Sequence, residues 1–277
     1  MPESSSAYAA PQSNGFIATV ELPGSKSLTN RELVLSALAS GPSELVDPLI
    51  SRDTKLMMAA LEKLGARFTQ NGNRLTVIPG SASGDCSIDC GLAGTVMRFV
   101  PPLAALSQGR IEFDGDAAAR RRPMITTIDS LLKLGVQVDC ERKALPFTVV
   151  GKGEVPGGEL EIDASASSQF VSGLLLSAAR FEYGLTLTHS GAHLPSMPHI
   201  EMTIETLRNR GVDIQQISEA TWRVSPGAIS GSEVQIEPDL SNAGPFLAAA
   251  LVTGGTVSIP NWPQQTTQVG AQFVELI

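Results

Sequence analysis

A self-similar unit recurs four times along the chain, about every 72 residues, and this repeat restricts the possible folds more than any single motif. Each unit begins with a short strand and a small polar cluster, continues into an apolar helix, and then adds an amphipathic helix and a strand pair. The opening strands are expected at 18–21, 87–89, 160–163 and 234–239, and the first helices end at Gly41, Gly109, Gly184 and Gly254. The pattern βαβαββ predicts a mixed α/β (α+β) fold.

The two helices of each unit differ in their apolar faces. Residues 170–179 and 246–252 are apolar on nearly all sides, which predicts buried helices. Residues 54–64 and 200–208 carry charge on one side, so these second helices should face solvent. We therefore expect parallel helices inside and sheets outside, an inside-out α/β barrel. All first helices would then begin at the same end.

The repeat also predicts how the chain divides into domains. Three units, residues 23–237, should form one complete domain, and residues 16–22 and 238–277 should contribute a strand and a first, incomplete unit to a second domain. Residues 1–15 read as a disordered polar lead-in. The fourth unit lacks the glycine that ends its second helix. We therefore expect a truncated chain from a parent of roughly 430 residues.

Composition excludes several classes of function. The net charge of −8 argues against a general nucleic-acid or anionic-membrane surface, so we expect small-molecule partners. No apolar run approaches the ~18 residues of a membrane-spanning helix, and no secretory signal opens the chain. Cys86, Cys90 and Cys140 lack CxxC spacing, which favours a reducing, cytoplasmic location and excludes a zinc site. We expect a monomer.

The segment LPGSKSLTNR, residues 22–31, combines a turn signal with Ser25, Lys26 and Ser27 at the mouth of an apolar helix. Helix N-termini attract anions because their N–H groups are unpaired and carry partial positive charge. Arg31 follows one turn later. The segment therefore predicts a site for a phosphate or carboxylate. The alternative is an ordinary serine-capped helix with a solvated lysine.

Two further clusters are candidates for the same anionic site. Three arginines at 120–122 precede Pro123, which is expected to open a helix, and the guanidinium of Arg122 could clamp a carboxylate or phosphate. Ser167, Ser168 and Gln169 stand in the third unit where the Ser-Lys-Ser cluster stands in the first. They could hold phosphate oxygens and orient a polyol. The alternatives are a solvated charge run and simple N-capping.

The shared end of the first helices should concentrate positive potential, to which Lys26, Arg31, Arg98 and Arg122 would contribute. His189, His193 and His199 match no metal-ligand spacing, so no metal is expected. His199, beside Ser196, is a better candidate for substrate contact. No Gly-x-Gly-x-x-Gly follows a strand and no Gly-x-Ser-x-Gly occurs, which argues against a dinucleotide cofactor and a hydrolase elbow.

Six segments, taken in order, carry a resemblance to a known family. They are LPGSKSLTNR, CGLAGTVMRF, DGDAAARRRPM, DASASSQFVSGLLLSAA, LPSMPHIEMT and EPDLSNAGPFLAAA, and the match extends over about residues 16–277. Together they closely resemble the 5-enolpyruvylshikimate-3-phosphate (EPSP) synthase family. The resemblance implies two domains of three βαβαββ units each, with the active site in the cleft between them.

The resemblance also implies a reaction. Members transfer the enolpyruvyl group of phosphoenolpyruvate to the 5-hydroxyl of shikimate 3-phosphate and release phosphate, on the shikimate pathway to chorismate and aromatic amino acids. They use no redox or nucleotide cofactor. Lys26 then resembles the catalytic lysine that contacts both substrates. The residues that resemble shikimate 3-phosphate ligands are Lys26, Ser27, Arg31, Ser167, Ser168, Gln169 and Ser196, and those that resemble phosphoenolpyruvate ligands are Lys26, Gly94, Arg122 and Gln169.

The sequence departs from the family pattern in three places. Leu92 stands where many members have Asn, and His199 where many have Tyr. The family's acid–base residues lie beyond Ile277, so the chain alone is expected to be inactive. One alternative is therefore a phospho-ligand-binding module without turnover. Another is the UDP-N-acetylglucosamine enolpyruvyl transferase, which has Lys-Asn where this chain has Lys26-Ser27 and typically a loop cysteine that residues 114–123 lack.

Overall fold

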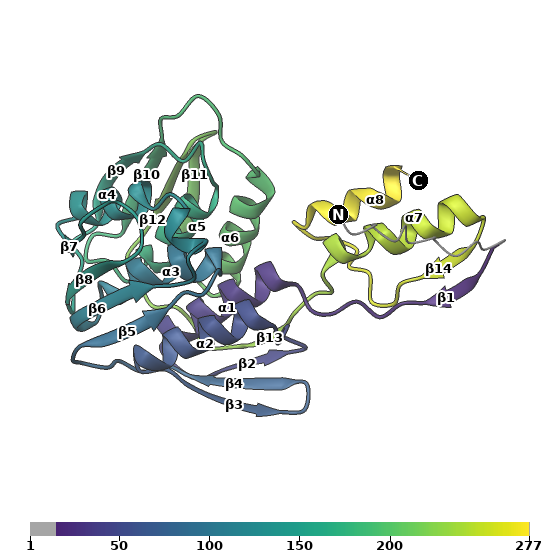
Figure 1. Ribbon diagram of the computed structural model, residues 1–277, viewed down its shortest axis with the longest axis horizontal. Helices are drawn as coiled ribbons and strands as arrows, with labels where there is room; N and C mark the ends of the chain where they lie inside the picture. Colours follow the sequence, from purple (N-terminus) through teal and green to yellow (C-terminus); the bar gives the residue numbers. More distant parts are fainter. Residues whose placement is uncertain (1–14, 277) are drawn as a thin grey trace, which may run out of the picture. The chain divides into compact units, whose positions relative to one another are not determined.

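The computed structural model describes residues 15–276, which form two compact units. The larger unit comprises residues 23–237, and the smaller comprises residues 15–22 together with 238–276 (Figure 1). The disordered lead-in expected at 1–15 lies almost wholly outside the described residues. Among these residues, no helix is both long and apolar enough to cross a membrane.

The larger unit contains three successive repeats. The first has α1 (Lys26–Leu38), β2 (Ser43–Val46), α2 (Arg52–Lys63), β3 (Arg67–Asn71) and β4 (Arg74–Ile78). The second has β5 (Cys86–Asp89), α3 (Gly94–Ala104), β6 (Gln108–Asp114), the 3-10 turn η1 (Ala119–Arg121), α4 (Ile125–Lys133), β7 (Gln137–Asp139) and β8 (Phe147–Lys152). The third has β9 (Gly158–Ile162), α5 (Gln169–Ala178), β10 (Leu185–His189), α6 (Met197–Asn209), β11 (Ile214–Ser218) and β12 (Thr221–Val224), and is followed by β13 (Glu233–Gln235). The mixed α/β class predicted from the sequence is confirmed.

Each repeat builds a four-stranded sheet with the same strand arrangement. The orders are β13-β2-β4-β3, β5-β6-β8-β7 and β9-β10-β12-β11. In each sheet the first two strands are parallel and the remaining pairings are antiparallel. The strands expected at 87–89 and 160–163 correspond to β5 and β9.

The first sheet takes its edge strand from the end of the larger unit. The repeat counts residues 18–21 as the opening strand of the first unit, although 16–22 were assigned to the second domain, and β1 (Ile17–Thr19) pairs in parallel with β14 (Thr256–Ser258) in the smaller unit. The place at the edge of the first sheet belongs to β13, which pairs in parallel with β2 (Figure 1). The segment expected to open the fourth unit, 234–239, therefore completes the first sheet instead. The repeat alone does not distinguish the two segments, because both have the alternation of a short strand.

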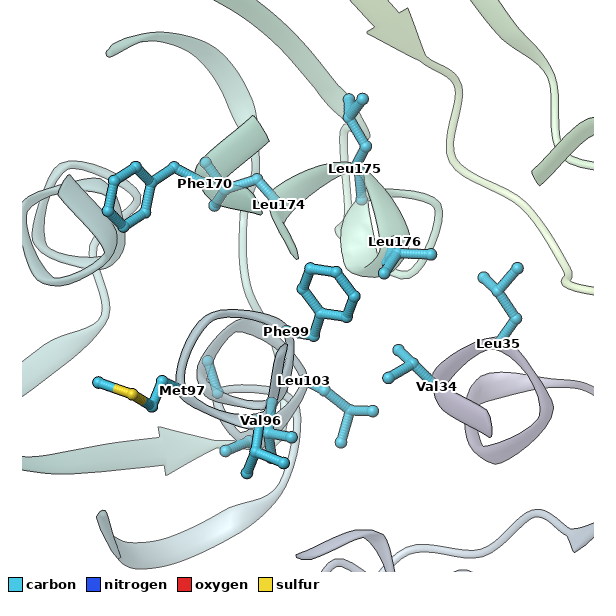
Figure 2. Packing of buried hydrophobic residues seen from close by; sticks show 14 of the residues in the cluster. Val34, Leu35, Val96, Met97, Phe99, Leu103, Phe170, Leu174, Leu175 and Leu176 are labelled. Carbon is cyan, nitrogen blue, oxygen red and sulfur yellow. The ribbon is translucent and has the colours of Figure 1, made fainter. Parts of the chain in front are cut away.

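The first helices of the three repeats form the core of the larger unit, as the sequence predicts. The helix α5 is buried along most of its length, and α1 and α3 each bury a continuous run of residues. Figure 2 shows Phe99 of α3 between the helices, facing Leu176 of α5 and Val34 of α1. The second helices, α2, α4 and α6, bury one face and expose the other.

These three core helices run in the same direction. Arg31 lies in the second turn of α1, and its guanidinium carbon is 5.5 Å from the ring centroid of Phe99 in the second turn of α3. The same guanidinium is 3.4 Å from the hydroxyl of Ser172 in the first turn of α5. Contacts between these N-terminal turns bring the starts of the three helices to one end of the larger unit.

A buried ion pair joins the first repeat to the third. Arg210, which ends α6, is fully buried, and its guanidinium donates to the Glu32 carboxylate at 2.6 and 2.9 Å. The remaining donors reach the hydroxyls of Ser36 and Ser43 at 2.9 Å and the carbonyl of Ser230 at 3.0 Å. Because its partners come from α1, from β2 and from the segment before β13, Arg210 fixes the closure of the three repeats.

The smaller unit contains β1, β14, η2 (Leu240–Asn242), α7 (Gly244–Thr253), η3 (Val269–Gln272) and α8 (Phe273–Leu276). The apolar helix expected to be buried at 246–252 corresponds to α7, and none of its residues is buried. Leu251 and Val252 are 63% and 81% exposed. The short elements that contact α7 within this unit, β14 and η2, are too small to cover it.

We predict that Glu32→Gln lowers the free energy of unfolding by about 3 kcal/mol, because the substitution leaves the buried charge of Arg210 without a counterion. Urea denaturation monitored by circular dichroism measures this change. The control is Asp139→Asn, which breaks the ion pair with Arg110 between side chains that are 43% and 51% exposed. The control should cost less than about 1 kcal/mol. Equal losses in the two variants would contradict a special role for the buried pair.

Candidate functional site

The N-terminus of α1 places Lys26 in partial contact with solvent. Ser25 caps the helix, since its hydroxyl accepts from the N–H of Leu28 at 3.5 Å. The side chain of Lys26 is 52% exposed and its ammonium lies 3.5 Å from the carboxylate of Asp53, the second residue of α2. The capping alternative therefore holds for Ser25, while Lys26 is held beside Asp53 at the mouth of the helix.

Arg31 has a more internal position than the sequence indicates. Its residue is 2% exposed, and its guanidinium donates to the hydroxyl of Thr203 at 2.8 Å and to the carbonyl of His199 at 2.7 Å. A further bond reaches the carbonyl of Ser27 at 2.9 Å. Burial lowers the pKa of Arg31 to about 9. Arg31 thus joins α1 to α6 directly beneath the surface where a ligand would bind.

Gly94, the first residue of α3, lies against two guanidinium groups. A Cβ atom at this position would be 2.9 and 3.0 Å from the terminal nitrogens of Arg122 and 3.0 Å from one of Arg98. Arg122 donates to the carbonyl of Leu92 at 3.1 Å, and Arg98 donates to the carbonyl of Gly94 at 3.2 Å. A larger residue here would displace these guanidinium groups, and the two cations meet at one helix N-terminus.

Arg98 was expected to add to the positive potential but was not among the predicted ligands. It is 3% exposed, and its guanidinium carbon lies 5.3 Å from the ring centroid of Phe170 in α5. Burial, and secondarily repulsion from Arg122, lower the pKa of Arg98 to about 10. Because Arg98 lies one helical turn after Gly94, its place in the site could have been predicted from the sequence.

The three consecutive arginines, residues 120–122, have different hydrogen-bond partners. Arg120 donates to both carboxylate oxygens of Asp114 at 2.9 and 2.5 Å, and Arg121 donates to the carbonyl of Ala117 at 3.2 Å. Only Arg122 among the three contacts the start of α3. The helix expected to open at Pro123 begins at Ile125 instead, and the separate 3-10 turn η1 precedes it at residues 119–121.

The serine loop, which we define as residues 163–168, ends at the N-terminus of α5. The hydroxyl of Ser167 accepts from the N–H of Gln169 at 3.2 Å, so Ser167 caps the helix. Ser168 is 5% exposed and makes no side-chain capping bond. The carbonyl oxygen of the Gln169 side chain is buried without a hydrogen-bond partner among residues 15–276.

Ser196 and His199 lie at the start of α6. Ser196 adopts a left-handed conformation with φ of 58°, and its hydroxyl lies 3.0 Å from Nδ1 of His199. Burial, and secondarily the nearby charge of Arg31, lower the pKa of His199. His189 lies on a strand and His193 in a loop, so the three histidines are not gathered at one point. Within the described part of the chain, no cluster of histidine, cysteine and carboxylate side chains could hold a metal.

Several buried polar atoms near the starts of the core helices have no hydrogen-bond partner among the described residues. They are Asn30 Oδ1, Thr95 Oγ1, Arg98 Nε and Gln169 Oε1. Buried polar atoms in native proteins are normally paired. Together with the partial positive charge of three helix N-termini and the guanidinium groups of Arg98 and Arg122, these atoms suit a multiply charged anionic ligand with hydroxyl groups.

Comparison with known proteins gives one consistent result. The family model described as EPSP synthase (3-phosphoshikimate 1-carboxyvinyltransferase) matches residues 12–277. A protein from Kocuria rhizophila named 3-phosphoshikimate 1-carboxyvinyltransferase is 59% identical, over 94% of this chain and 61% of that protein. Two solved structures of EPSP synthase from Acinetobacter baumannii share the fold, with TM-scores of 0.77 at 22% identity, over 92% of this chain and 58% and 57% of theirs. The chain thus spans about three fifths of the length of these relatives.

We predict that His199 makes the protein less stable in acid. Because its pKa is lowered from 6.5 on folding, the unfolded chain binds a proton at a pH where the folded chain does not. The free energy of unfolding should therefore fall as pH drops below about 6.5, and His199→Asn should remove this part of the slope. Urea denaturation between pH 8 and pH 5.5 measures it. The control is the exposed His193→Asn, and equal slopes in both variants would contradict the prediction.

Proposed function

Because the chain belongs to the EPSP synthase family, we propose that it forms the shikimate 3-phosphate-binding part of an enolpyruvyl transferase. The enzyme would transfer the enolpyruvyl group of phosphoenolpyruvate to the 5-hydroxyl of shikimate 3-phosphate and release phosphate. The observation that carries this proposal is the meeting of Arg98 and Arg122 at Gly94, beside the N-terminus of α5. In this proposal residues 23–237 are the substrate-binding domain and the smaller unit belongs to a second domain.

The helix N-termini suit the shikimate 3-phosphate half of the reaction. Ser167 and Ser168 precede α5, where backbone N–H groups and hydroxyls can donate to phosphate oxygens. Ser196 lies at the start of α6, and Gln169 provides an amide for the ring hydroxyls. The fixed guanidinium of Arg31 supports these groups from below and adds a positive charge that bulk water screens little.

The start of α3 suits phosphoenolpyruvate. Arg122 presents a planar fork that can bind a carboxylate or phosphate with two parallel hydrogen bonds. It is held by the carbonyl of Leu92, so this support does not depend on the side chain at position 92. The departure from Asn to Leu therefore leaves the placement of Arg122 intact. The absence of a side chain at Gly94 gives the ligand access to both guanidinium groups.

Lys26 suits the reacting centre. Both substrates are anions, so bringing them together requires cations that reduce their mutual repulsion. The ammonium of Lys26 is a mobile point charge on a flexible stem, and Asp53 holds it at the mouth of α1 until a ligand competes for it. Its proposed role is to stabilise negative charge that develops as the enolpyruvyl group moves.

We predict that the chain binds shikimate 3-phosphate and that Lys26→Met weakens this binding by about tenfold, as expected for the loss of one charged hydrogen bond. Isothermal titration calorimetry measures the affinity. The control is Lys63→Met, which removes an equivalent charge at the far end of α2 and should leave the affinity unchanged. No heat of binding for the unmodified chain, or equal losses in both variants, would contradict the proposed site. Arg31 is a poor probe because its removal would also break the contacts between α1 and α6.

We predict that Arg122→Lys raises the KM for phosphoenolpyruvate by about tenfold or more in an enzyme containing this chain, because lysine cannot form the bidentate fork. The affinity for shikimate 3-phosphate should change less than about twofold. Steady-state phosphate release with each substrate varied measures both quantities. Arg121→Lys is the matched control, since Arg121 contacts only the carbonyl of Ala117 among the described residues. A change confined to shikimate 3-phosphate would mean that Arg122 serves the other ligand.

A further inference from the structure

His189 is a buried histidine that the proposed function does not use, and it lies at the base of the serine loop. It is the last residue of β10 and is paired with Ile162, the last residue of β9. Its backbone N–H donates to the carbonyl of Ala220 at 2.8 Å, and the next residue, Ser190, donates to Ile162 at 3.0 Å. The backbone of His189 is therefore fixed by β9 on one side and by the turn between β11 and β12 on the other.

The imidazole ring of His189 makes a hydrogen bond to the loop. Its Nδ1 accepts from the backbone N–H of Ala164 at 3.0 Å, and the residue is 7% exposed. An acceptor at Nδ1 requires the neutral ring with its proton on Nε2. The Nε2 atom is buried and has no hydrogen-bond partner among the described residues. The bond to Ala164 is thus the one hydrogen bond that these residues give the ring.

This bond is the first of a chain of bonds that runs to the proposed ligand-binding residues. The carbonyl of Ala164 accepts from the N–H of Ser167 at 3.0 Å. The hydroxyl of Ser167 in turn accepts from the N–H of Gln169 at 3.2 Å. Ala164 and Ser167 each take part in two of these bonds, so the bonds connect His189 to Gln169 without a break. The direction of the Ser167 hydroxyl and the start of α5 therefore depend on where His189 holds Ala164.

The backbone at Gly191 packs against both the loop and the ring of His189. A Cβ atom there would lie 2.2 Å from the Ser165 hydroxyl, 2.3 Å from the Asp163 carboxylate and 2.5 Å from Cε1 of His189. The carboxylate of Asp163 accepts from the N–H of Ser165 at 2.9 Å, which tightens the same turn. The loop is therefore in contact with the ring of His189 and with the backbone that follows it.

We propose that His189 is a positioning residue for the serine loop, which sets the hydrogen-bonding geometry of Ser167 and Gln169 through Ala164. The ligand of that loop is taken from the proposed function, so the effect on shikimate 3-phosphate rests on it. The hydrogen bonds from His189 to the loop are present without a ligand, so they can be tested on the ligand-free chain. His189 does not contact the ligand and acts only by fixing the backbone that does.

The test compares three substitutions in the full chain. In His189→Asn the side-chain oxygen takes the place of Nδ1, in His189→Gln the polar group lies farther out, and in His189→Leu no acceptor remains. Amide hydrogen exchange measured by NMR on the ligand-free protein reports on Ala164 and Ser167, with Leu187 of β10 as the internal reference. We expect exchange at both amides to accelerate about tenfold in the Leu and Gln variants and less than about threefold in the Asn variant.

Calorimetric titration with shikimate 3-phosphate then measures the consequence for binding. The Leu and Gln variants should bind about tenfold more weakly, and the Asn variant should bind within about threefold of the unmodified chain. If His189 had only a structural role, its substitution would alter the unfolding midpoint but leave the affinity of the folded protein unchanged. The Leu, Gln and Asn variants would then bind shikimate 3-phosphate equally well.

Unchanged exchange at Ala164 and Ser167 in the Gln and Leu variants would overturn the inference, as would unchanged affinity in both. If the Leu variant fails to fold, the comparison of Asn with Gln decides in the same way. If the unmodified chain shows no binding, the proposed function fails, and the exchange measurement still decides whether His189 holds the loop.

Discussion

The buried guanidinium of Arg31 is the interaction on which the arrangement of the site depends. It contacts the carbonyl of His199 and the hydroxyl of Thr203 in α6, and it lies near Phe99 of α3 and Ser172 of α5. One side chain of α1 therefore reaches every other helix whose N-terminus contributes to the site. A buried charge is tolerated only when its hydrogen bonds are satisfied, so the four helices must keep their register for Arg31 to remain paired.

The need to keep Arg31 paired explains why the anionic site lies at the starts of these helices. Parallel core helices are set by packing of apolar residues such as Leu176 and Val34, and that packing alone would allow some sliding along the helix axes. Arg31 and the ion pair between Arg210 and Glu32 remove that freedom, because polar contacts are directional. The N-termini of α1, α3 and α5 then stay at the same height along the helix axes, so their partial positive charges add at one site.

Much of this organisation could be predicted from the sequence, for identifiable reasons. The apolar character of 170–179 predicts a buried helix, and charge on one side of 200–208 predicts an exposed one, because burial follows directly from periodicity. The cluster at 25–27 likewise predicts the start of α1. The family resemblance assigned Gly94 and Arg122 to one site, and the two residues lie in contact.

The parts that could not be predicted depend on contacts between residues far apart in the sequence. The burial of Arg31 and Arg98 follows from helices of other repeats, and local pattern gives no measure of it. The ring of His189 is close to Ala164 only because β9 and β10 are adjacent. The pairing of β13 with β2 is of the same kind, since most of the three repeats separates these two strands in the sequence.

The pairing of β2 with a strand as distant in sequence as β13 has a consequence for how the protein folds as it is synthesised. Residues 43–46 and 67–78 leave the ribosome early, but the strand that covers the edge of their sheet, β13, is made after all three repeats. Until then the N–H and C=O groups along the free edge of β2 remain available to other chains. Pairing over so large a sequence separation is also slow. The first repeat is therefore the part of the nascent chain most in need of protection from intermolecular strand pairing.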